Sequence, residues 1–350
     1  MLIKFDRRAP EQDINLILTK LNDAGSRAFR SRSNQNPVIV TTGNIDILKE
    51  LNLDKINSVE RIVDISTSFQ LASRNFKEAN TVVKVGHLEI GGDKIQVMAG
   101  PCAVESREQL FQTAQLVKAC GAALLRGGAF KPRTSPYSFQ GLNEYGLKLL
   151  AEARSLTGLK IVTEVMDTRS VDLVAKYADI LQIGARNMQN FDLLKEVGNI
   201  NKPVLLKRGA GASIEEWLTA AEYILAGGNE NVILCERGVR GVNEFTRYTL
   251  DLAAVPVVKK LTHLPVIVDP SHGTGHWRYV TPMSLAAIAA GADGLIIEVH
   301  PEPEKALCDG GQSLTPKNFQ ALMARLATLR GIVHREFEEP KIKLQSVNMN

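Results

Sequence analysis

A run of cationic and hydroxyl side chains follows one short apolar segment of the sequence, residues 122–125. Arg126 and two glycines come directly after that segment, and a loop stiffened by two prolines then carries Lys131, Arg133, Thr134 and Ser135. Glycines let backbone N–H groups approach a phosphate, Arg offers a planar fork of donors, and hydroxyl groups complete an anion's surroundings. The stiffness argues against a loop whose cations are merely solvated. The segment therefore predicts a site for a phosphate or a carboxylate.

The elements that must position these residues alternate regularly from about residue 95 onward. Short apolar segments predict strands near 96–99, 122–125, 161–164, 180–183, 204–206, 232–234, 266–268 and 295–297. Amphipathic segments predict helices near 107–119, 145–156, 171–177, 191–197, 214–226, 245–255, 282–290 and 316–329. Eight strand–helix units predict a (β/α)8 TIM barrel, which is an α/β fold. A doubly wound open sheet is the alternative, and the lack of a G-x-G-x-x-G motif after the first strand disfavours it.

Each predicted strand ends in residues that an apolar barrel core would reject. One set, at the strand ends and on the loop that follows Arg126, is cationic: Arg126, Lys131, Arg133, Arg186, Lys207, Arg208 and Arg237. The active sites of TIM barrels lie at the C-terminal ends of the strands, so these side chains are expected at one mouth. Like charges around one rim are costly to bury unless an anion neutralises them. We expect two or three of these cations to pair with acids such as Glu164 and Glu236, and the others to bind more than one phosphate or carboxylate.

A second set of side chains at the same mouth suits a metal ion. Cys102 follows the first predicted strand, His272 the seventh and Glu298 the eighth, and Asp309 lies on the next loop. The first, seventh and eighth strands of a closed barrel are neighbours, so the four side chains can converge. A thiolate, an imidazole and two carboxylates suit Mn²⁺, Fe²⁺, Co²⁺ or Zn²⁺ better than Ca²⁺. Asp269 is a competing ligand, but it lies deeper in its strand.

The first 75 residues predict a separate α+β unit. Its elements follow the order of a ferredoxin-like domain: strand 2–5, helix 11–24, a strand near 28, strand 38–41, helix 45–51 and strand 59–65. The unit has no His and no catalytic cluster, so we expect a regulatory or assembly role. Residues 76–94 predict a linker and part of a hairpin, which spans 87–95 and has a glycine turn. Residues 95–335 form the predicted catalytic barrel, and residues 336–350 a polar C-terminal tail.

The composition excludes several classes of partner. The 350 residues are 44% hydrophobic and 23% charged, and the net charge of +4 is spread along the chain, so neither nucleic acid nor a membrane surface is an expected partner. The N-terminus reaches charged residues too soon for a signal peptide, and no apolar run has spanning length. Four scattered cysteines without C-x-x-C spacing predict free thiols. We therefore expect a cytoplasmic protein.

The motifs at the strand ends together resemble one known family. They are Ala99-Gly100-Pro101-Cys102, Arg126 through Tyr137, Gln182 through Asn187, Leu206 through Gly209, Cys235 through Gly238, Asp269 through His272, and Glu298-Val299-His300. The chain resembles 3-deoxy-D-arabino-heptulosonate 7-phosphate (DAHP) synthase of type I, in the short branch that carries an N-terminal ferredoxin-like domain. The motifs of the barrel match from about 95 to 330, whereas the first 75 residues match by pattern alone.

This resemblance implies a metal-dependent, aldol-type condensation of phosphoenolpyruvate with erythrose 4-phosphate, which gives DAHP and phosphate at the entry to the shikimate pathway. It implies a divalent metal on Cys102, His272, Glu298 and Asp309, and no organic cofactor. It assigns phosphoenolpyruvate to Arg126, Lys131, Arg186, Lys207 and Arg237, and the sugar phosphate to Arg133, Thr134 and Ser135. The catalytic candidates are Lys131 as proton donor to the new alkoxide, Glu164 as the group that orients water, and Asp269.

Two other functions remain as alternatives. The sister enzyme 3-deoxy-D-manno-octulosonate 8-phosphate synthase uses arabinose 5-phosphate and typically shows Lys-Ala-Asn-Arg-Ser, where this chain has the stiffer Lys131 through Ser135. A non-catalytic sensor of phosphorylated metabolites is disfavoured by the complete metal set. The family also implies inhibition by Tyr or Phe within a homotetramer. Cys308 stands where Ser is expected, and we predict that it forms a disulfide with Cys102 under oxidation when metal is absent.

Overall fold

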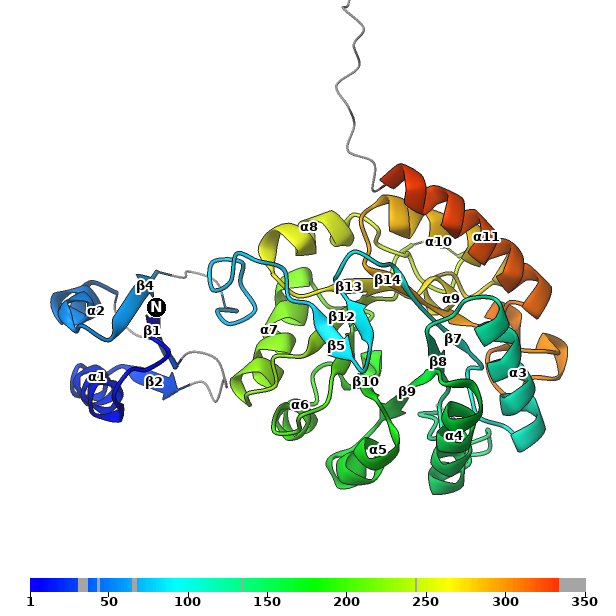
Figure 1. The fold of residues 1–350 in the computed structure, drawn as a ribbon, viewed down its shortest axis with the longest axis horizontal. Coiled ribbons are helices and arrows are strands. Elements are labelled where there is room, and N and C mark those ends of the chain that lie inside the picture. Colours follow the sequence, from blue (N-terminus) through cyan, green and yellow to red (C-terminus); the bar gives the residue numbers. More distant parts are fainter. Residues whose placement is uncertain (31–36, 43–44, 65–67, 134, 243, 334–350) are drawn as a thin grey trace, which may run out of the picture.

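The chain from residue 96 onward forms a closed barrel of parallel strands. The computed structural model describes residues 1–30, 37–42, 45–64, 68–133, 135–242 and 244–333, so the predicted tail and Thr134 lie outside the described residues. The strands close in the order β10-β11-β12-β13-β14-β7-β8-β9, with helices around the outside (Figure 1). This closure confirms the predicted (β/α)8 TIM barrel and excludes the open sheet.

The barrel strands start and end close to their predicted limits. They are β7 Gln96–Gly100, β8 Leu124–Arg126, β9 Lys160–Val165, β10 Ile180–Ile183, β11 Val204–Lys207, β12 Val232–Glu236, β13 Val266–Val268 and β14 Gly294–Glu298. The helices are α3 Arg107–Ala119, α4 Asn143–Thr157, α5 Val171–Tyr177, α6 Phe191–Gly198, α7 Ile214–Ala226, α8 Ala254–Leu261, α9 Pro270–Thr274, α10 Trp277–Ala289 and α11 Pro316–Val333. Short apolar strands buried on both faces are typical of parallel sheets covered by helices.

The predicted helix over 245–255 is wrong. The described residues before α8 form a series of bends, with an antiparallel bridge between Val239 and Thr249. The backbone N–H groups of Arg247 and Tyr248 donate to the carbonyl oxygens of Thr274 and Gly273, at 2.9 and 3.0 Å. These bonds to a segment distant in sequence replace the local bonds of a helix.

A hairpin closes the N-terminal end of the barrel. Its strands are β5 Val83–Val85 and β6 Leu88–Ile90, and in Figure 1 it lies across the barrel in front of the strands. The turn falls at Gly86, where φ is +63°, so the glycine turn predicted within 87–95 is displaced. Val83, Val85 and Ile90 pack in one cluster with the first inward-facing layer of the strands. The bottom of the barrel is therefore an apolar plug.

The N-terminal unit is a four-stranded antiparallel sheet with two helices. Its elements are β1 Leu2–Phe5, α1 Glu11–Asp23, β2 Arg27–Arg30, β3 Val38–Thr42, α2 Ile45–Glu50 and β4 Val59–Val63. The sheet order is β2-β3-β1-β4. Ile3 and Phe5 of β1 are buried with Ile14 and Ile17 of α1, so the unit has a core of its own. It lies beside the barrel, on the side of α7 (Figure 1).

The segment that joins the two parts is fastened to the barrel. The backbone N–H groups of Leu71 and Ala72 donate to the Glu222 carboxylate of α7, at 2.8 and 2.9 Å. The buried His263, which precedes β13, lies 2.8 Å through Nε2 from the Leu71 carbonyl oxygen and 2.7 Å through Nδ1 from the Thr81 hydroxyl. No described helix is long and apolar enough to cross a membrane.

Candidate active site and metal centre

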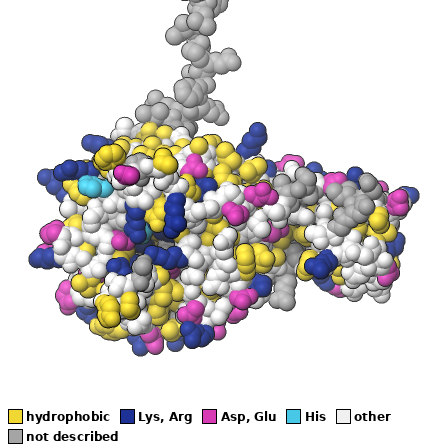
Figure 2. All heavy atoms as spheres, turned by 180° about the vertical axis from the view of Figure 1, so that it is seen from behind, with side chains coloured by type: hydrophobic (Ala, Val, Ile, Leu, Met, Phe, Trp, Pro, Cys, Tyr) yellow, Lys and Arg dark blue, Asp and Glu magenta, His cyan; other side chains and the backbone are white. Residues whose placement is uncertain are grey.

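A cavity of about 840 Å³ opens at the C-terminal ends of the strands. Figure 2 views the molecule from the side opposite the hairpin and shows Lys and Arg side chains gathered around this hollow. Eight cations line it: Arg126, Lys131, Arg133, Arg186, Lys207, Arg237, Arg240 and Arg247. Three acids line it: Glu164, Glu216 and Asp309. Such an excess of positive charge in a partly enclosed space favours anionic ligands.

Three of the cations expected at the rim are paired with acids. Arg126 Nη1 lies 2.9 Å from Glu298 Oε1, and Arg208 Nη1 lies 2.9 Å from Glu236 Oε2. Lys207 pairs with Asp269. Arg208 also contacts Asp251 and does not line the cavity, so its role is structural. The expectation that two or three rim cations are paired is confirmed.

The remaining expected cations have no carboxylate within ion-pair distance among the described residues: Lys131, Arg133, Arg186 and Arg237. Arg237 stacks over the Tyr248 ring, with 4.2 Å from its Cζ to the ring centre. Burial acts to raise the pKa of Tyr248, but the charge of Arg237 and a hydrogen bond to it outweigh burial and lower it. Arg126 Nε is a buried donor without a partner in the described structure. Cations without a carboxylate partner, together with the unpartnered Arg126 Nε, are suited to an anion that enters the cavity.

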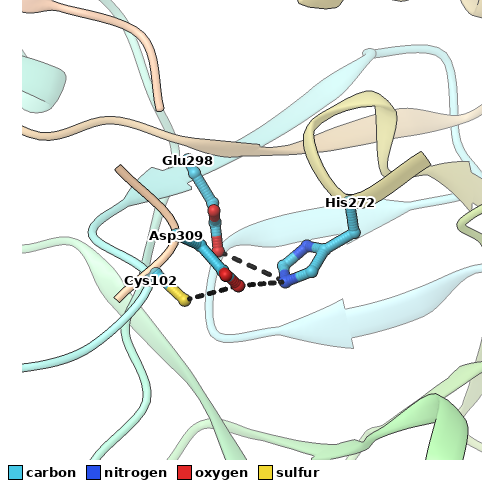
Figure 3. A group of neighbouring side chains, drawn as sticks. All are labelled: Cys102, His272, Glu298 and Asp309. Carbon is cyan, nitrogen blue, oxygen red and sulfur yellow. Dashed lines mark hydrogen bonds and ion pairs between the residues drawn. The ribbon is translucent and has the colours of Figure 1, made fainter. Parts of the chain in front are cut away.

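Four predicted metal ligands meet at the floor of the cavity. One ligand atom from each of Cys102, His272, Glu298 and Asp309 lies within 4.8 Å of the other three (Figure 3). His272 Nε2 is 3.3 Å from Glu298 Oε1 and 3.9 Å from Asp309 Oδ2. Cys102 Sγ is 3.5 Å from Asp309 Oδ2. The set of sulfur, nitrogen and oxygen donors fits a divalent transition metal.

The barrel geometry explains why these four residues converge. Glu298 is the last residue of β14 and lies opposite Gly100 of β7, two residues before Cys102. A side chain at position 100 would collide with the Arg126 carbonyl oxygen, so glycine is required for the close approach of β7 and β8. Asp309 has φ +51°, a left-handed conformation that Asp tolerates better than most residues. Neighbouring strands therefore bring together residues that are far apart in sequence.

Asp269 lies behind the cluster and does not line the cavity. Its Oδ2 atom is 2.8 Å from His272 Nδ1 and also accepts a hydrogen bond from Lys207 Nζ. Burial acts to raise the pKa of Asp269, but the charges of His272 and Lys207 outweigh it and hold that pKa well below its usual range. Because the ionised carboxylate accepts the proton on Nδ1, Nε2 of His272 is left free to ligate. Asp269 is thus placed to orient a ligand rather than to contact substrate.

Two cysteines face each other beside Lys131. Cys102 Sγ lies 3.1 Å from Cys308 Sγ, so the expected proximity of the two thiols is confirmed, and the structure records both as free. The hydrogen bond from Cys102 to Cys308 raises the pKa of Cys102 and lowers that of Cys308. Lys131 Nζ lies 3.1 Å from Cys102 Sγ, and Arg133 Nη1 lies 2.6 Å from Cys308 Sγ. Disulfide formation on oxidation stays a prediction.

Sequence reasoning missed several residues at or near the mouth: Arg240, Arg247, Tyr248 and Gln312. Gln182, which belongs to a predicted strand-end motif, donates to Glu164 at 3.3 Å. Arg240 and Arg247 lie in or next to the segment whose predicted helix is wrong, which hid their approach to the cavity. The role of Gln312 depends on contacts with Glu298 and Arg247, which are distant in sequence, so no local pattern predicts it.

Comparison with known proteins identifies the family to which the chain is similar. Residues 63–334 match the model of the DAHP synthetase I family. The phospho-2-dehydro-3-deoxyheptonate aldolase of Thermotoga maritima is 46% identical over 335 residues, which cover 95% of this chain and 99% of that protein. A crystal structure of that aldolase from the same organism superposes with a TM-score of 0.76 at 44% identity and covers 95% of this chain and 97% of the other.

A second group of relatives matches a smaller part of the chain. The 2-dehydro-3-deoxyphosphooctonate aldolase of Geobacter sp. strain M21 is 33% identical over 273 residues, which cover 72% of this chain and 98% of that protein. A truncated 3-deoxy-D-arabino-heptulosonate 7-phosphate synthase from Thermotoga maritima superposes with a TM-score of 0.71 at 49% identity, over 76% of this chain and 98% of the other. The family match and the long relative agree with the cavity and the ligand cluster, and the chain belongs to the DAHP synthetase I family.

Proposed function

We propose that the barrel mouth condenses phosphoenolpyruvate with erythrose 4-phosphate to give DAHP and phosphate, the first step of the shikimate pathway. The observation that carries this function is the surplus of cations beside a complete set of metal ligands. Two phosphorylated substrates would balance that charge. The choice of sugar is supported by the heptonate aldolase that matches nearly the whole chain, since the octonate aldolases match about three quarters of it.

Five cations would hold phosphoenolpyruvate: Arg126, Lys131, Arg186, Lys207 and Arg237. All five line the same cavity, and the unpartnered Arg126 Nε provides a buried donor for the anion. The sugar phosphate would lie on the loop of Arg133, Thr134 and Ser135. Arg133 and Ser135 line the cavity, which supports this division, while Thr134 lies outside the described residues.

Cys102, His272, Glu298 and Asp309 would hold a divalent metal, of which Mn²⁺, Co²⁺, Fe²⁺ and Zn²⁺ fit the donor set. When bound, the metal supplies Lewis acidity to the aldehyde oxygen of the sugar. Burial acts to raise the pKa of Glu298, but the charges of His272 and Arg126 outweigh it and lower the pKa. The carboxylate is therefore in the ionised form that a ligand requires.

Lys131 is the proposed proton donor to the new hydroxyl group. It lines the cavity, is 8% exposed, and its Nζ lies 3.1 Å from the Cys102 carbonyl oxygen. Burial acts to lower the pKa of Lys131, but neighbouring Cys102 and Cys308 outweigh it and raise the pKa, so the group carries a proton to give. Glu164, held by Gln182, would orient the water that attacks C2 of the enol. Asp269 would act by orienting His272.

The N-terminal unit would be a ferredoxin-like regulatory domain over residues 1–75, followed by the linker and hairpin to residue 94. Its order of strands and helices and its sheet order β2-β3-β1-β4 support this assignment. We extend the proposal to inhibition by Tyr or Phe, a homotetramer and a cytoplasmic location, the last supported by four free cysteines. Deletion of residues 1–75 should abolish inhibition and preserve turnover, and inhibition retained without them would refute the assignment.

Phosphate release measured with each sugar tests the reaction. We expect phosphate release with phosphoenolpyruvate and erythrose 4-phosphate, at a higher kcat/KM than with arabinose 5-phosphate, and loss of activity on treatment with a chelator. Faster turnover of arabinose 5-phosphate would establish the octulosonate reaction instead. Binding of phosphoenolpyruvate without phosphate release from any sugar, with Mn²⁺ present, would support a sensor.

A further inference from the structure

We infer that Gln312 and Arg247 are positioning residues of the metal centre, which together fix one carboxylate oxygen of Glu298 toward the point where the four ligand atoms meet. The inference rests on the metal site of the proposed function. Neither residue belongs to the ligand set, and Gln312 does not line the cavity. Both act through contacts with the carboxylates.

Gln312 holds one oxygen of Glu298, while the other oxygen accepts from Arg126 Nη1 at 2.9 Å and keeps a lone pair for the centre. The side-chain amide is buried, 3% exposed, in the short turn that follows Asp309. Its Nε2 atom donates to Glu298 Oε2 at 2.7 Å. The other oxygen, Oε1, is the one that lies 3.3 Å from His272 Nε2. With Oε2 engaged, Glu298 presents Oε1 as its ligand atom.

Arg247 sets the orientation of the Gln312 amide. Its Nη1 atom donates to Gln312 Oε1 at 3.0 Å. A guanidinium only donates hydrogen bonds and an ionised carboxylate only accepts them, so an amide between Arg247 and Glu298 satisfies both in one orientation alone. Removing Arg247 would leave the amide free to turn its oxygen toward Glu298, which would replace an attraction with a repulsion.

Arg247 also links the loops that carry two other ligands. Its backbone N–H donates to the Thr274 carbonyl oxygen at 2.9 Å, beside the helix that carries His272. Its Nη1 atom reaches to 3.5 Å from Asp309 Oδ2. The backbone of Arg247 is therefore bound to the segment that carries His272, and its side chain contacts the carboxylate of Asp309. Arg247 thus braces, that is, connects, the two loops on either side of the centre.

Binding of Mn²⁺ to the metal-free full-length protein tests the inference, with free Mn²⁺ followed by electron paramagnetic resonance. Gln312→Leu should weaken the Mn²⁺ Kd roughly 10- to 100-fold, the usual cost of losing a group that orients a metal ligand. Gln96→Leu is the matched control, because Gln96 is also buried and its amide donates to Glu89 O at 3.0 Å at the other end of the barrel. We expect Q96L to keep the wild-type Kd. An unchanged Kd in Q312L, or an equal loss in Q96L, would overturn the inference.

Arg247→Ala distinguishes positioning from simple electrostatics. Removing a cation beside a metal site should tighten Mn²⁺ binding if charge alone matters, whereas loss of the brace should weaken it. The Arg247 side chain is 36% exposed, so this variant tests the same contact without emptying a buried position. We expect weaker binding in R247A, and in the double variant a loss smaller than the product of the two single losses. Tighter binding in R247A would overturn its role.

The metal requirement for turnover gives a second readout. Q312L should need a higher Mn²⁺ concentration for half-maximal activity and should regain most of the wild-type kcat at saturating Mn²⁺, with the KM for phosphoenolpyruvate unchanged. A low kcat that excess Mn²⁺ does not restore would contradict positioning. If the wild-type protein itself bound no Mn²⁺, the metal site of the proposed function would fail together with the inference, and the wild-type titration alone would reveal this.

Discussion

The two ends of the barrel are built from the same eight strands but differ in what they bury. At the N-terminal end, the interior is apolar, and Ile90 of the hairpin packs with residues such as Ile267 and Ile296. At the C-terminal end, the interior holds charged pairs, including Arg126 with Glu298, both at most 5% exposed by side chain. Burial at one end removes hydrocarbon from water, and at the other it removes charge.

This difference indicates that residues at the N-terminal end of the barrel stabilise the fold, whereas residues at the C-terminal end serve the chemistry. Buried apolar contacts stabilise the folded state directly. Buried ion pairs contribute little net stability, because the cost of removing the charges from water offsets their attraction. The mouth therefore keeps its charges for a reason other than folding, and the cavity and ligand cluster supply that reason. Substitutions at the two ends should separate activity from stability.

The largest effect is expected for the ligand at the end of β13. His272→Gln should abolish Mn²⁺ binding and lower kcat/KM by about 10⁴-fold, because a Lewis acid contributes several kcal/mol to a transition state. Ile267→Val, in the strand β13 that precedes the helix of His272, changes a residue of the apolar cluster and should lower the free energy of unfolding by about 1 kcal/mol while leaving kcat/KM unchanged. Steady-state kinetics and urea denaturation of both variants measure this contrast. A tenfold loss of kcat/KM in I267V would break the separation.

A smaller loss is expected for the proton donor at the mouth. Lys131→Met should lower kcat by about 10³-fold, within the range for removal of a general acid. Lys131→Arg keeps the charge but does not release a proton near neutral pH, so it should retain the KM for phosphoenolpyruvate while kcat falls. Phosphate-release kinetics of the two variants distinguish the roles. A kcat for K131R within tenfold of wild type would show that Lys131 serves only to bind.

The apolar plug should show the opposite behaviour. Ile90→Ala removes a fully buried side chain and should lower the free energy of unfolding by about 3 kcal/mol, from lost transfer energy and the cavity left behind. Because Ile90 lies at the far end from the cavity, the KM values and kcat should stay as in wild type at 25 °C. Urea denaturation and kinetics on the same preparation give both numbers. A changed KM for either substrate would mean that the hairpin communicates with the mouth.

The sequence predicted what depends on local pattern. The alternation of apolar and amphipathic segments was enough to predict the barrel. Because the first and last strands of such a barrel are neighbours, the sequence alone also predicted that Cys102, His272 and Glu298 lie close together. The helix over 245–255 failed because Arg247 and Tyr248 use their backbone N–H groups on Gly273 and Thr274, contacts that no local pattern reveals.

Positions that depend on contacts between distant loops were also out of reach. The family resemblance gives Asp269 as a catalytic candidate, but its contact with His272 Nδ1 follows from the turn into α9. The sequence did not predict a role for Gln312, because an amide near a turn can have many partners and only the structure shows that these are Glu298 and Arg247. Sequence thus defined which residues gather at the mouth, and structure defined which atoms face each other.

The smallest expected effect concerns pH and the bottom of the barrel, where His263 fastens the segment after the N-terminal unit. Burial, aided by the nearby charges of Lys77 and Arg74, outweighs a hydrogen bond to Leu71 and lowers the pKa of His263 to about 4. The Leu71 carbonyl oxygen can only accept, so Nε2 carries the proton of the neutral ring and Nδ1 accepts from the Thr81 hydroxyl. A proton on Nδ1 would break this contact.

Because the folded pKa lies below the unfolded value of about 6.5, the unfolded chain binds the proton first as pH falls. The contribution of His263 is fully present above pH 6.5 and is lost between pH 6.5 and 4, by about 1 kcal/mol at pH 5.5. His263→Gln has no titrating ring, so its deficit relative to wild type, measured by urea denaturation, should shrink by that amount between pH 7.5 and 5.5. A deficit that stays constant over this range would show that folding leaves the pKa of His263 unchanged. A deficit that grows as pH falls would show that the ring is charged in the folded protein, and the hydrogen bond from Thr81 would then have to be reversed.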